Sequence, residues 1–142
     1  MTKTALFLVV SAFASNAFAG QCLTESLLYG YSLSAQGEQP GDYEVGRLQF
    51  DGNGNVDYTG VNVSSGVLTD ISGRGTYSVG TNCMATITIN EKTGVMTLRG
   101  ILDSMDNSTD IRLAYAASMV GVDGQGNSLL GIINRMVISG RY

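Results

Sequence analysis

The chain has 142 residues, of which 44% are hydrophobic and 14% charged, with a formal net charge of −4, 19 glycines, one proline, and no histidine or tryptophan. This length suits one domain, and the low charge and high glycine content argue against a helical bundle, a coiled coil and a charged disordered chain. The lack of histidine excludes Ser–His and Cys–His catalysis and histidine-containing zinc sites, and the acidic balance offers no basic patch for nucleic acid.

The first 19 residues have the pattern of a signal peptide. Lys3 precedes an apolar run from Ala5 to Ala14, and Ala17-Phe18-Ala19 fits the small-x-small motif that signal peptidase cleaves. The run is shorter than the roughly 20 residues of a membrane-spanning helix. A hydrophobic first strand is the alternative. We therefore expect residues 1–19 to be a signal peptide and residues 20–142 to form one secreted or periplasmic domain.

Two cysteines, Cys22 and Cys83, remain in the mature chain. In an oxidising compartment an even cysteine count predicts a disulfide, and two cysteines allow one intramolecular pairing. It would close a loop of about 60 residues. An intermolecular bond and two buried thiols are the alternatives, whereas the absence of C-x-x-C spacing argues against a redox role.

Alternation of apolar residues with polar or small ones recurs along the mature chain and predicts strands rather than helices. In chain order, the segments that hold one apolar phase are Tyr29–Ala35, Gly46–Phe50, Val56–Tyr58 continuing at Val61–Val63, Val67–Val79, Cys83–Ile89, Met96–Leu102, Ile111–Met119 and Leu130–Ile138. The change of phase after Gly60 suggests a β-bulge.

Turn residues separate these segments. Asp51-Gly52-Asn53-Gly54-Asn55 and Asp123-Gly124-Gln125-Gly126-Asn127 share a D-G-x-G-N pattern, whose glycines accept positive φ and favour a hairpin. Eight strands joined by short turns predict an all-β fold, a single antiparallel up-and-down β-barrel, with a two-sheet β-sandwich as the alternative. The glycines within strands fit corners where a small sheet curls to close, at Gly46, Gly73, Gly75 and Gly100.

The segments 46–56 and 72–83 also carry a resemblance to a known group. They read G-x-x-x-F-D-G-x-G-N and S-G-x-G-T-Y-x-V-x-x-N-C. This resembles small secreted bacterial proteins of unassigned function that are thought to be calycin-like barrels, related in shape to lipocalins and the allene oxide cyclase barrel. The resemblance implies a barrel and a secreted location, and it carries no catalytic residues across.

Oxygen-bearing side chains offer two further interpretations. Asp51, Asn53, Asn55 and Asp57 alternate like the start of an EF-hand loop, but Val56 stands where that loop needs glycine, and a hairpin turn explains the same residues. The acidic residues fall almost entirely in or beside predicted turns, so we expect no acid–base pair. We expect neither a metal, nor a cofactor, nor an enzymatic activity.

Four tyrosines share a phase with apolar residues: Tyr29, Tyr31, Tyr77 and Tyr115. If that phase faces inward, these side chains line a pocket with hydroxyl groups; the alternative is that they fill the core. We expect a non-enzymatic barrel that binds a small apolar ligand or associates through its outer surface. A ligand binder predicts a dry cavity, whereas an assembly protein of the cell envelope predicts a filled barrel with an exposed apolar patch or an open strand edge.

A small outer-membrane β-barrel is the remaining alternative. Eight strands, a signal peptide and the terminal aromatic Tyr142 are features of that class. The lack of tryptophan and strands shorter than the 9–11 residues needed to cross a bilayer argue against it. We therefore expect no association with a membrane and none with nucleic acid.

Overall fold

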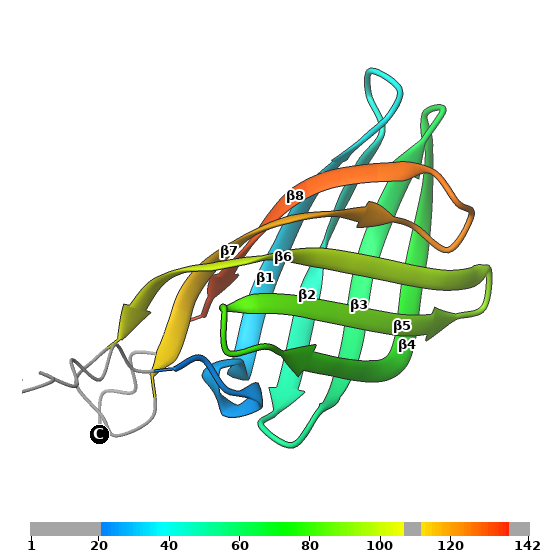
Figure 1. Ribbon diagram of the computed structural model, residues 1–142. Coiled ribbons are helices and arrows are strands. Elements are labelled where there is room, and N and C mark those ends of the chain that lie inside the picture. The colour runs from blue at the N-terminus through cyan, green and yellow to red at the C-terminus, as the bar shows by residue number, and fades with distance from the viewer. Residues whose placement is uncertain (1–20, 107–111, 137–142) are drawn as a thin grey trace, which may run out of the picture.

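The computed structural model describes residues 21–106 and 112–136, which form a closed barrel of eight antiparallel strands (Figure 1). Each strand pairs with the next, and β8 pairs with β1, so the prediction of an up-and-down barrel is confirmed over the sandwich. The strands are β1 (Leu28–Gly37), β2 (Tyr43–Asp51), β3 (Asn55–Ser64), β4 (Val67–Val79), β5 (Met84–Glu91), β6 (Gly94–Asp106), β7 (Leu113–Val122) and β8 (Ser128–Arg135), preceded by a 3-10 helix, η1 (Thr24–Ser26). The predicted signal peptide lies outside the described residues.

The two ends of the barrel differ. The turns that follow β1, β3, β5 and β7 lie at one end, here called the mouth. The turns that follow β2 and β4 lie at the other end together with η1, and we call this the closed end (Figure 1). Because consecutive strands run in opposite directions, every second turn returns to the same end.

Large side chains fill the barrel from the closed end through its middle. The largest of these side chains are at most 2% exposed, and they are Tyr31, Tyr58, Phe50, Leu27, Leu33, Leu48, Ile87, Ile89, Met96, Leu98, Met119 and Ile133. Burying a side chain of this kind contributes roughly 1.5–3 kcal/mol before chain entropy is subtracted. The interior is therefore a packed hydrophobic core.

Glycines within the strands stand where a neighbouring strand leaves no space for a side chain. A Cβ at Gly75 would overlap the carbonyl oxygen of Thr88 on β5, and a Cβ at Gly100 would overlap that of Ser118 on β7. Neither contact leaves room for a side chain, so these positions require glycine for space.

The predicted bulge at Gly60 is wrong. The register runs without interruption through this residue on both sides, as Gly60 pairs with Gly46 on β2 and with Ile71 on β4. The apparent change of phase arises because Val61 and Val63 lie on the outward-facing side of β3, where they pair with Val45 and Tyr43. Gly60 serves another purpose, which is to make room for a buried side chain at the mouth.

In the last strand, the residues that share the predicted phase face outward. Leu129 and Ile133 are buried, whereas Leu130 and Ile132 are 66% and 48% exposed on the outer face. Both sides of β8 carry large apolar residues, so alternation alone did not indicate which side faces inward.

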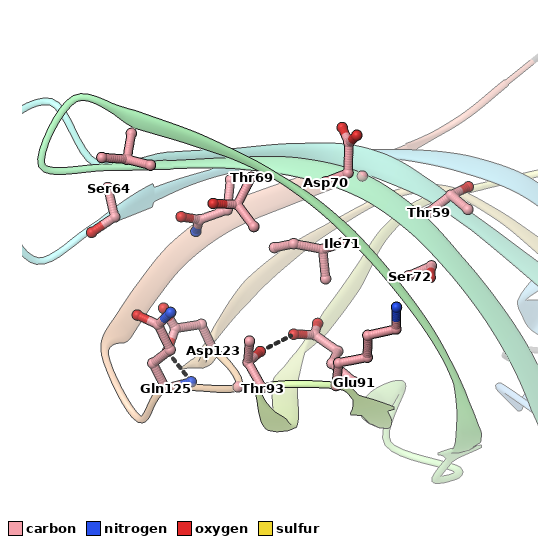
Figure 2. Close-up of a pocket in the computed structure, with 15 residues that line it drawn as sticks. Thr59, Ser64, Thr69, Asp70, Ile71, Ser72, Glu91, Thr93, Asp123 and Gln125 are labelled. Carbon is pink, nitrogen blue, oxygen red and sulfur yellow. Dashed lines mark hydrogen bonds between the residues drawn. The ribbon is translucent and has the colours of Figure 1, made fainter.

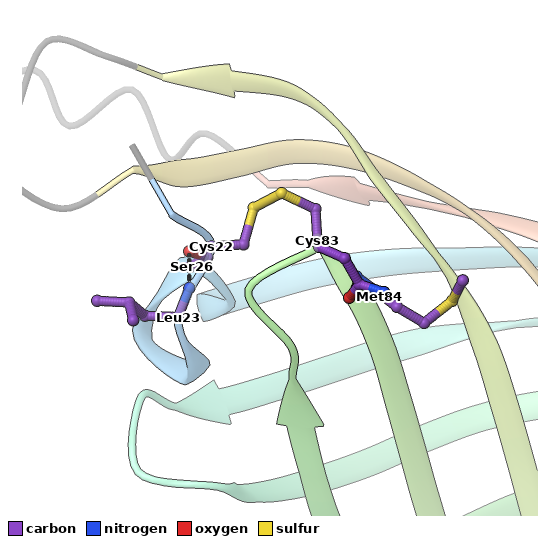
Figure 3. The surroundings of a disulfide bond; sticks show 6 residues. Cys22, Leu23, Ser26, Cys83 and Met84 are labelled. Atoms are coloured by element: carbon purple, nitrogen blue, oxygen red, sulfur yellow. Dashed lines mark hydrogen bonds between the residues drawn. A yellow bond between two sulfur atoms is a disulfide. The ribbon is translucent and has the colours of Figure 1, made fainter. Parts of the chain in front are cut away.

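A disulfide holds the closed end together. Cys22, just before η1, is bonded to Cys83 in the turn between β4 and β5, with the two Cα atoms 5.0 Å apart (Figure 3). This confirms the intramolecular pairing. Close by, Leu27 is fully buried and its carbonyl oxygen accepts a hydrogen bond of 2.8 Å from the hydroxyl of Tyr77. The disulfide and this hydrogen bond together fix the N-terminal segment against the end of the core.

Removing the disulfide should destabilise the fold strongly. Closing a loop of 61 residues lowers the entropy of the unfolded chain, which corresponds to on the order of 4 kcal/mol. We expect the C22S/C83S double variant to lose about 2–4 kcal/mol of unfolding free energy in urea titrations. A loss below about 0.5 kcal/mol would contradict a stabilising role; mass spectrometry of the unreduced wild type, about 2 Da lighter than the reduced chain, checks the starting material.

Candidate functional site

A cleft of about 570 Å³ opens at the mouth of the barrel (Figure 2). Its lining residues come from β3 (59–64), β4 (67–72), the end of β5 with the turn after it (91–93) and the β7–β8 turn (123–125). Figure 2 shows Ile71, Thr93 and Glu91 pointing into the same space, whereas Asp70 points away from it. The cleft thus combines an apolar side chain, hydroxyl groups and carboxylates.

A fully buried carboxylate lies beside the cleft. Glu44 on β2 is 0% exposed; Tyr58 donates a hydrogen bond of 2.7 Å to its Oε1, and Asn62, which lines the cleft, donates one of 3.4 Å to its Oε2. Burial raises the pKa of Glu44 above its ordinary value, and burial beside this carboxylate raises the pKa of Tyr58 as well. Glu44 is therefore a constrained, hydrogen-bonded acid within the barrel.

Two glycines create the space for this pair. A Cβ at Gly46 would lie 2.5 Å from Cε2 of Tyr58, and a Cβ at Gly60 would overlap its hydroxyl oxygen. The ring of Tyr58 therefore lies over two side-chain-free positions on β2 and β3. This arrangement brings its hydroxyl group to Glu44.

Glu91 is the most unusual group of the cleft. It ends β5, and its Oε1 is buried without a hydrogen-bond partner, while its Oε2 accepts a hydrogen bond of 3.4 Å from Thr93. Burial, and after it the negative charge of Glu44, raises the pKa of Glu91 to about 7. A buried carboxylate oxygen without a donor costs free energy, so this residue is held in an unfavourable environment.

Asp123 adds a third carboxylate but is fully engaged in its turn. It is 7% exposed; its Oδ1 accepts hydrogen bonds from the backbone N–H groups of Gln125 (2.9 Å) and Asn127 (2.8 Å), and its Oδ2 accepts one from the Asn127 side chain. Its charge contributes to the raised pKa values of Glu44 and Glu91. The mouth of the barrel is therefore electrostatically negative.

The first D-G-x-G-N turn has the same internal hydrogen bonds. The Oδ1 of Asp51 accepts from the backbone N–H groups of Asn53 and Asn55, and its Oδ2 accepts from the Asn55 side chain. The oxygens that resemble a calcium loop are thus used to form a hairpin. Within the described ranges, no group of three or more acidic, cysteine or histidine residues is placed to hold a metal ion.

Tyr31 and Tyr77 lie inside the barrel, as the inward phase predicts, but at its closed end. Their rings stack edge-on against Phe50, with centroids 5.4 and 4.8 Å away. The Tyr31 hydroxyl donates to the carbonyl oxygen of Ala114 at 2.6 Å, and burial raises the pKa of Tyr31 to about 12. Neither tyrosine lines the mouth cleft. That they contact a ligand stays a prediction.

The expectation that Tyr29 and Tyr115 line the barrel is wrong. Both lie on the outer face, 58% and 41% exposed. Tyr29 has a φ of 75°, which breaks the alternation before Tyr31, and buried Ala114 breaks it next to Tyr115. The Tyr115 ring packs under the guanidinium of Arg135 at 4.4 Å.

Tyr29 does line a second, smaller hollow on the outside of the barrel. This hollow has a volume of about 360 Å³, and Arg47, Gln49 and Arg135 are among its lining residues. Its other lining residues are Gly30, Leu113 and Met136.

Sequence reasoning missed Glu44 and Glu91. Glu44 does share the apolar phase of Gly46, Leu48 and Phe50, and that parity was a signal that it faces inward. Its proximity to the predicted turn favoured a solvated interpretation instead. Glu91 likewise continues the buried phase of Ala85, Ile87 and Ile89, but it lies in the predicted turn at residues 90–94, which favoured the same solvated interpretation.

No protein-family model matches the sequence, and no curated protein does. Among solved structures, a redesigned β-barrel aligns with a TM-score of 0.58 and 18% identity, over 80% of this chain and 95% of that one. Another redesigned barrel, mFAP0 bound to DFHBI, aligns with a TM-score of 0.49 and 16% identity, over 78% and 99% of the two chains. At these identities the first likeness shows the barrel fold alone. The described residues contain no helix long and apolar enough to cross a membrane.

The raised pKa of Glu91 should make stability depend on pH. The folded state retains a proton that the unfolded chain releases between about pH 4.5 and 7, so the unfolding free energy should fall as pH rises through this range. We expect E91Q to reduce the loss between pH 5 and pH 8 by about 1 kcal/mol, allowing for the partial exposure of the side chain. Urea titrations at both pH values measure this effect.

The matched control is E38Q, which changes an exposed turn carboxylate. It should leave the pH profile as in the wild type. If E91Q and E38Q have the same profile, Glu91 does not titrate in the way its surroundings indicate.

Removing the Tyr58 hydroxyl should leave Glu44 without its shorter hydrogen bond. We expect Y58F to lower the unfolding free energy by about 1–3 kcal/mol at pH 8, and by less at a lower pH, because the raised pKa of Glu44 means that lowering the pH favours its uncharged form. Denaturation at the two pH values, with Y43F as a control at an exposed ring, measures the difference. Equal losses for Y58F and Y43F would show that the buried hydrogen bond contributes nothing.

Proposed function

We propose that the protein is a non-enzymatic binding barrel that holds a small ligand noncovalently in its mouth cleft. The observation that carries this proposal is the cleft itself, in which an open volume of about 570 Å³ adjoins the unpartnered Oε1 of Glu91. Ligand pockets are commonly 300–1,000 Å³ with a few oriented polar groups. A ligand that donates a hydrogen bond to Glu91 would relieve part of the cost of its burial.

The lining supports a ligand that is partly apolar and partly a hydrogen-bond donor. Ile71 and Val67 offer apolar contact, and Glu91 and Asn62 offer polar contact. A wholly apolar ligand inside the barrel would have to displace packed side chains such as Phe50 and Leu48. The mouth is therefore the better position for a small ligand with an apolar part.

Binding without chemical transformation fits the available groups. The chain has no histidine to activate a nucleophile, and we assign Glu91, whose pKa is raised to about 7, the role of a hydrogen-bond acceptor for the ligand. Both oxygens of Glu44 accept hydrogen bonds from Tyr58 and Asn62, which supports a structural use of this acid.

The proposed location is outside the cytoplasm. The Cys22–Cys83 disulfide is compatible with an oxidising compartment, and the signal-peptide pattern and the resemblance to secreted calycin-like barrels point the same way. On the outer face, Arg74 and Asp57 form an ion pair of 3.1 Å with side chains 90% and 65% exposed. Charges on a lipid-facing surface are costly, so this pair supports a barrel surrounded by water over an outer-membrane barrel.

A second candidate function is association through the outer face of β6–β8. Six large apolar residues are 39–66% exposed there: Val95, Ile101, Val120, Val122, Leu130 and Ile132. Val120 pairs directly with Leu130, so these two side chains form an apolar pair across neighbouring strands, with Arg99 of β6 on the other side of Val120. Exposed apolar patches are typical of interaction surfaces. A filled barrel together with exposed apolar residues is the combination expected above for an assembly protein of the cell envelope.

Native mass spectrometry of protein purified without detergent tests the binding proposal. We expect an adduct of a few hundred daltons that is lost on denaturation. The variant T69W places a large ring on the cleft side of β4 and should abolish the adduct, whereas L68W places the same ring on the opposite side of the strand and should retain it.

A wild-type spectrum without an adduct, or an adduct that T69W retains, would contradict ligand binding in the cleft. A discrete oligomer without an adduct would favour the outer face of β6–β8 as the functional surface.

A further inference from the structure

One wall of the mouth cleft is an open strand edge. β4 pairs with β3 along its whole first part, from Val67 onward, but pairs with β5 only from Gly73, opposite Glu91. The segment Val67–Ser72 therefore has a neighbouring strand on one side alone. Residues of this segment line the cleft.

The hydrogen bonds between β4 and β5 show which way the backbone N–H and C=O groups of Val67–Ser72 point. The N–H of Gly80 donates to the carbonyl oxygen of Met84 on the β5 side, and backbone groups alternate sides along a strand. The N–H and C=O groups of Leu68, Asp70 and Ser72 consequently point away from β3. Among the described residues, none of these groups has a backbone hydrogen-bond partner.

An edge of this kind can bind another extended chain. Unpaired N–H and C=O groups in a row are a template for strand addition, in which the backbone supplies affinity and alternate side chains supply specificity. Six residues of strand span about 20 Å. The exposed side chains of Val67 (63%) and Leu68 (67%) add apolar surface at the start of the edge.

The charges near the edge indicate what the added strand carries. Glu91 and Asp123 line the cleft on the inner side, and Asp70 lies on the edge itself. Lys92 is the one basic residue among the lining residues. A lysine or arginine in the added strand would therefore meet opposite charge on either face.

The same charges argue against a second copy of this chain as the occupant. Antiparallel pairing of the whole edge with itself would place Asp70 of one molecule opposite Asp70 of the other. Like charges directly opposite each other destabilise a strand pair.

We propose that an extended peptide segment with a basic side chain binds at the mouth by adding a strand to β4 along Val67–Ser72. This inference rests on the proposed function of the cleft and names the class of its ligand. The peptide lies between β4 and the β5–β6 turn, and its lysine or arginine side chain binds beside Glu91.

The test uses a capped six-residue peptide of alternating valine and threonine with one central lysine. Amide hydrogen exchange of the full chain, followed by NMR, reports on individual N–H groups. With saturating peptide, exchange at Leu68, Asp70 and Ser72 should slow by at least about tenfold. Thr69 and Ile71, whose N–H groups face β3, serve as the internal control and should change little.

Two N-methylated peptides give a matched control for backbone pairing. Methyl groups on every second residue block one edge of the peptide, so one of the two alternating patterns should weaken binding at least about tenfold while the other does not. Replacing lysine by norleucine should weaken binding to the wild type severalfold and weaken binding to E91Q less.

Binding of the peptide without slower exchange at the three edge residues would overturn strand addition, as would equal effects of the two methylation patterns. If the purified protein shows the adduct but the same protein, freed of it by unfolding and refolding, does not bind the peptide, this inference is overturned and the proposed function stands. A dimer protected at the same three amides would identify a second copy as the occupant and overturn the choice of a basic peptide.

Discussion

Closure of the sheet by pairing of β8 with β1 is the constraint on which the rest of the structure depends. Strands in a closed barrel are staggered, so neighbouring strands cannot all begin and end together. β4 has 13 residues and β5 has eight, and the excess of β4 extends beyond its neighbour at the mouth. The cleft and its unpaired wall are therefore products of barrel closure rather than additions to it.

A packed interior and a polar mouth are compatible because small residues are placed between large ones. Phe50 and Leu48 fill the barrel where β2 runs through it, and Gly46 follows on the same side near the mouth. The space left by this glycine holds the Tyr58 ring, which brings a hydroxyl group to Glu44. A buried acid is tolerated because a dedicated donor reaches it. Glu91 accepts one long hydrogen bond, from Thr93, and its other oxygen has no partner. The free-energy cost of burying a carboxylate is therefore larger at Glu91 than at Glu44.

The sequence indicated features that depend on local chemistry. The strand count and the paired D-G-x-G-N turns could be predicted because turn residues act through short-range rules, and the Cys22–Cys83 bond could be predicted because two cysteines allow one intramolecular pairing. The inward-facing side of a strand could not be predicted where the backbone departs from regular alternation, as at Tyr29 with its positive φ. It could not be predicted in β8 either, because both sides of that strand are apolar. The cleft could not be predicted because it depends on closure of the whole sheet. Closure sets the offset between the ends of β4 and β5 and brings the charge of Glu44 close enough to affect Glu91.

The two D-G-x-G-N turns stand at opposite ends of the barrel with the same internal hydrogen bonds. The copy that begins at Asp51 is exposed at the closed end, whereas the copy that begins at Asp123 is buried beside the cleft. The repeat is thus a duplicated folding element and not a duplicated site. The molecule therefore contains an internal comparison. The turn at Asp51 is surrounded by water, whereas the turn at Asp123 lies in the electric field of Glu44 and Glu91. Because the two turns share the D-G-x-G-N sequence, any difference between them in dynamics or in their response to acid reports the effect of their surroundings.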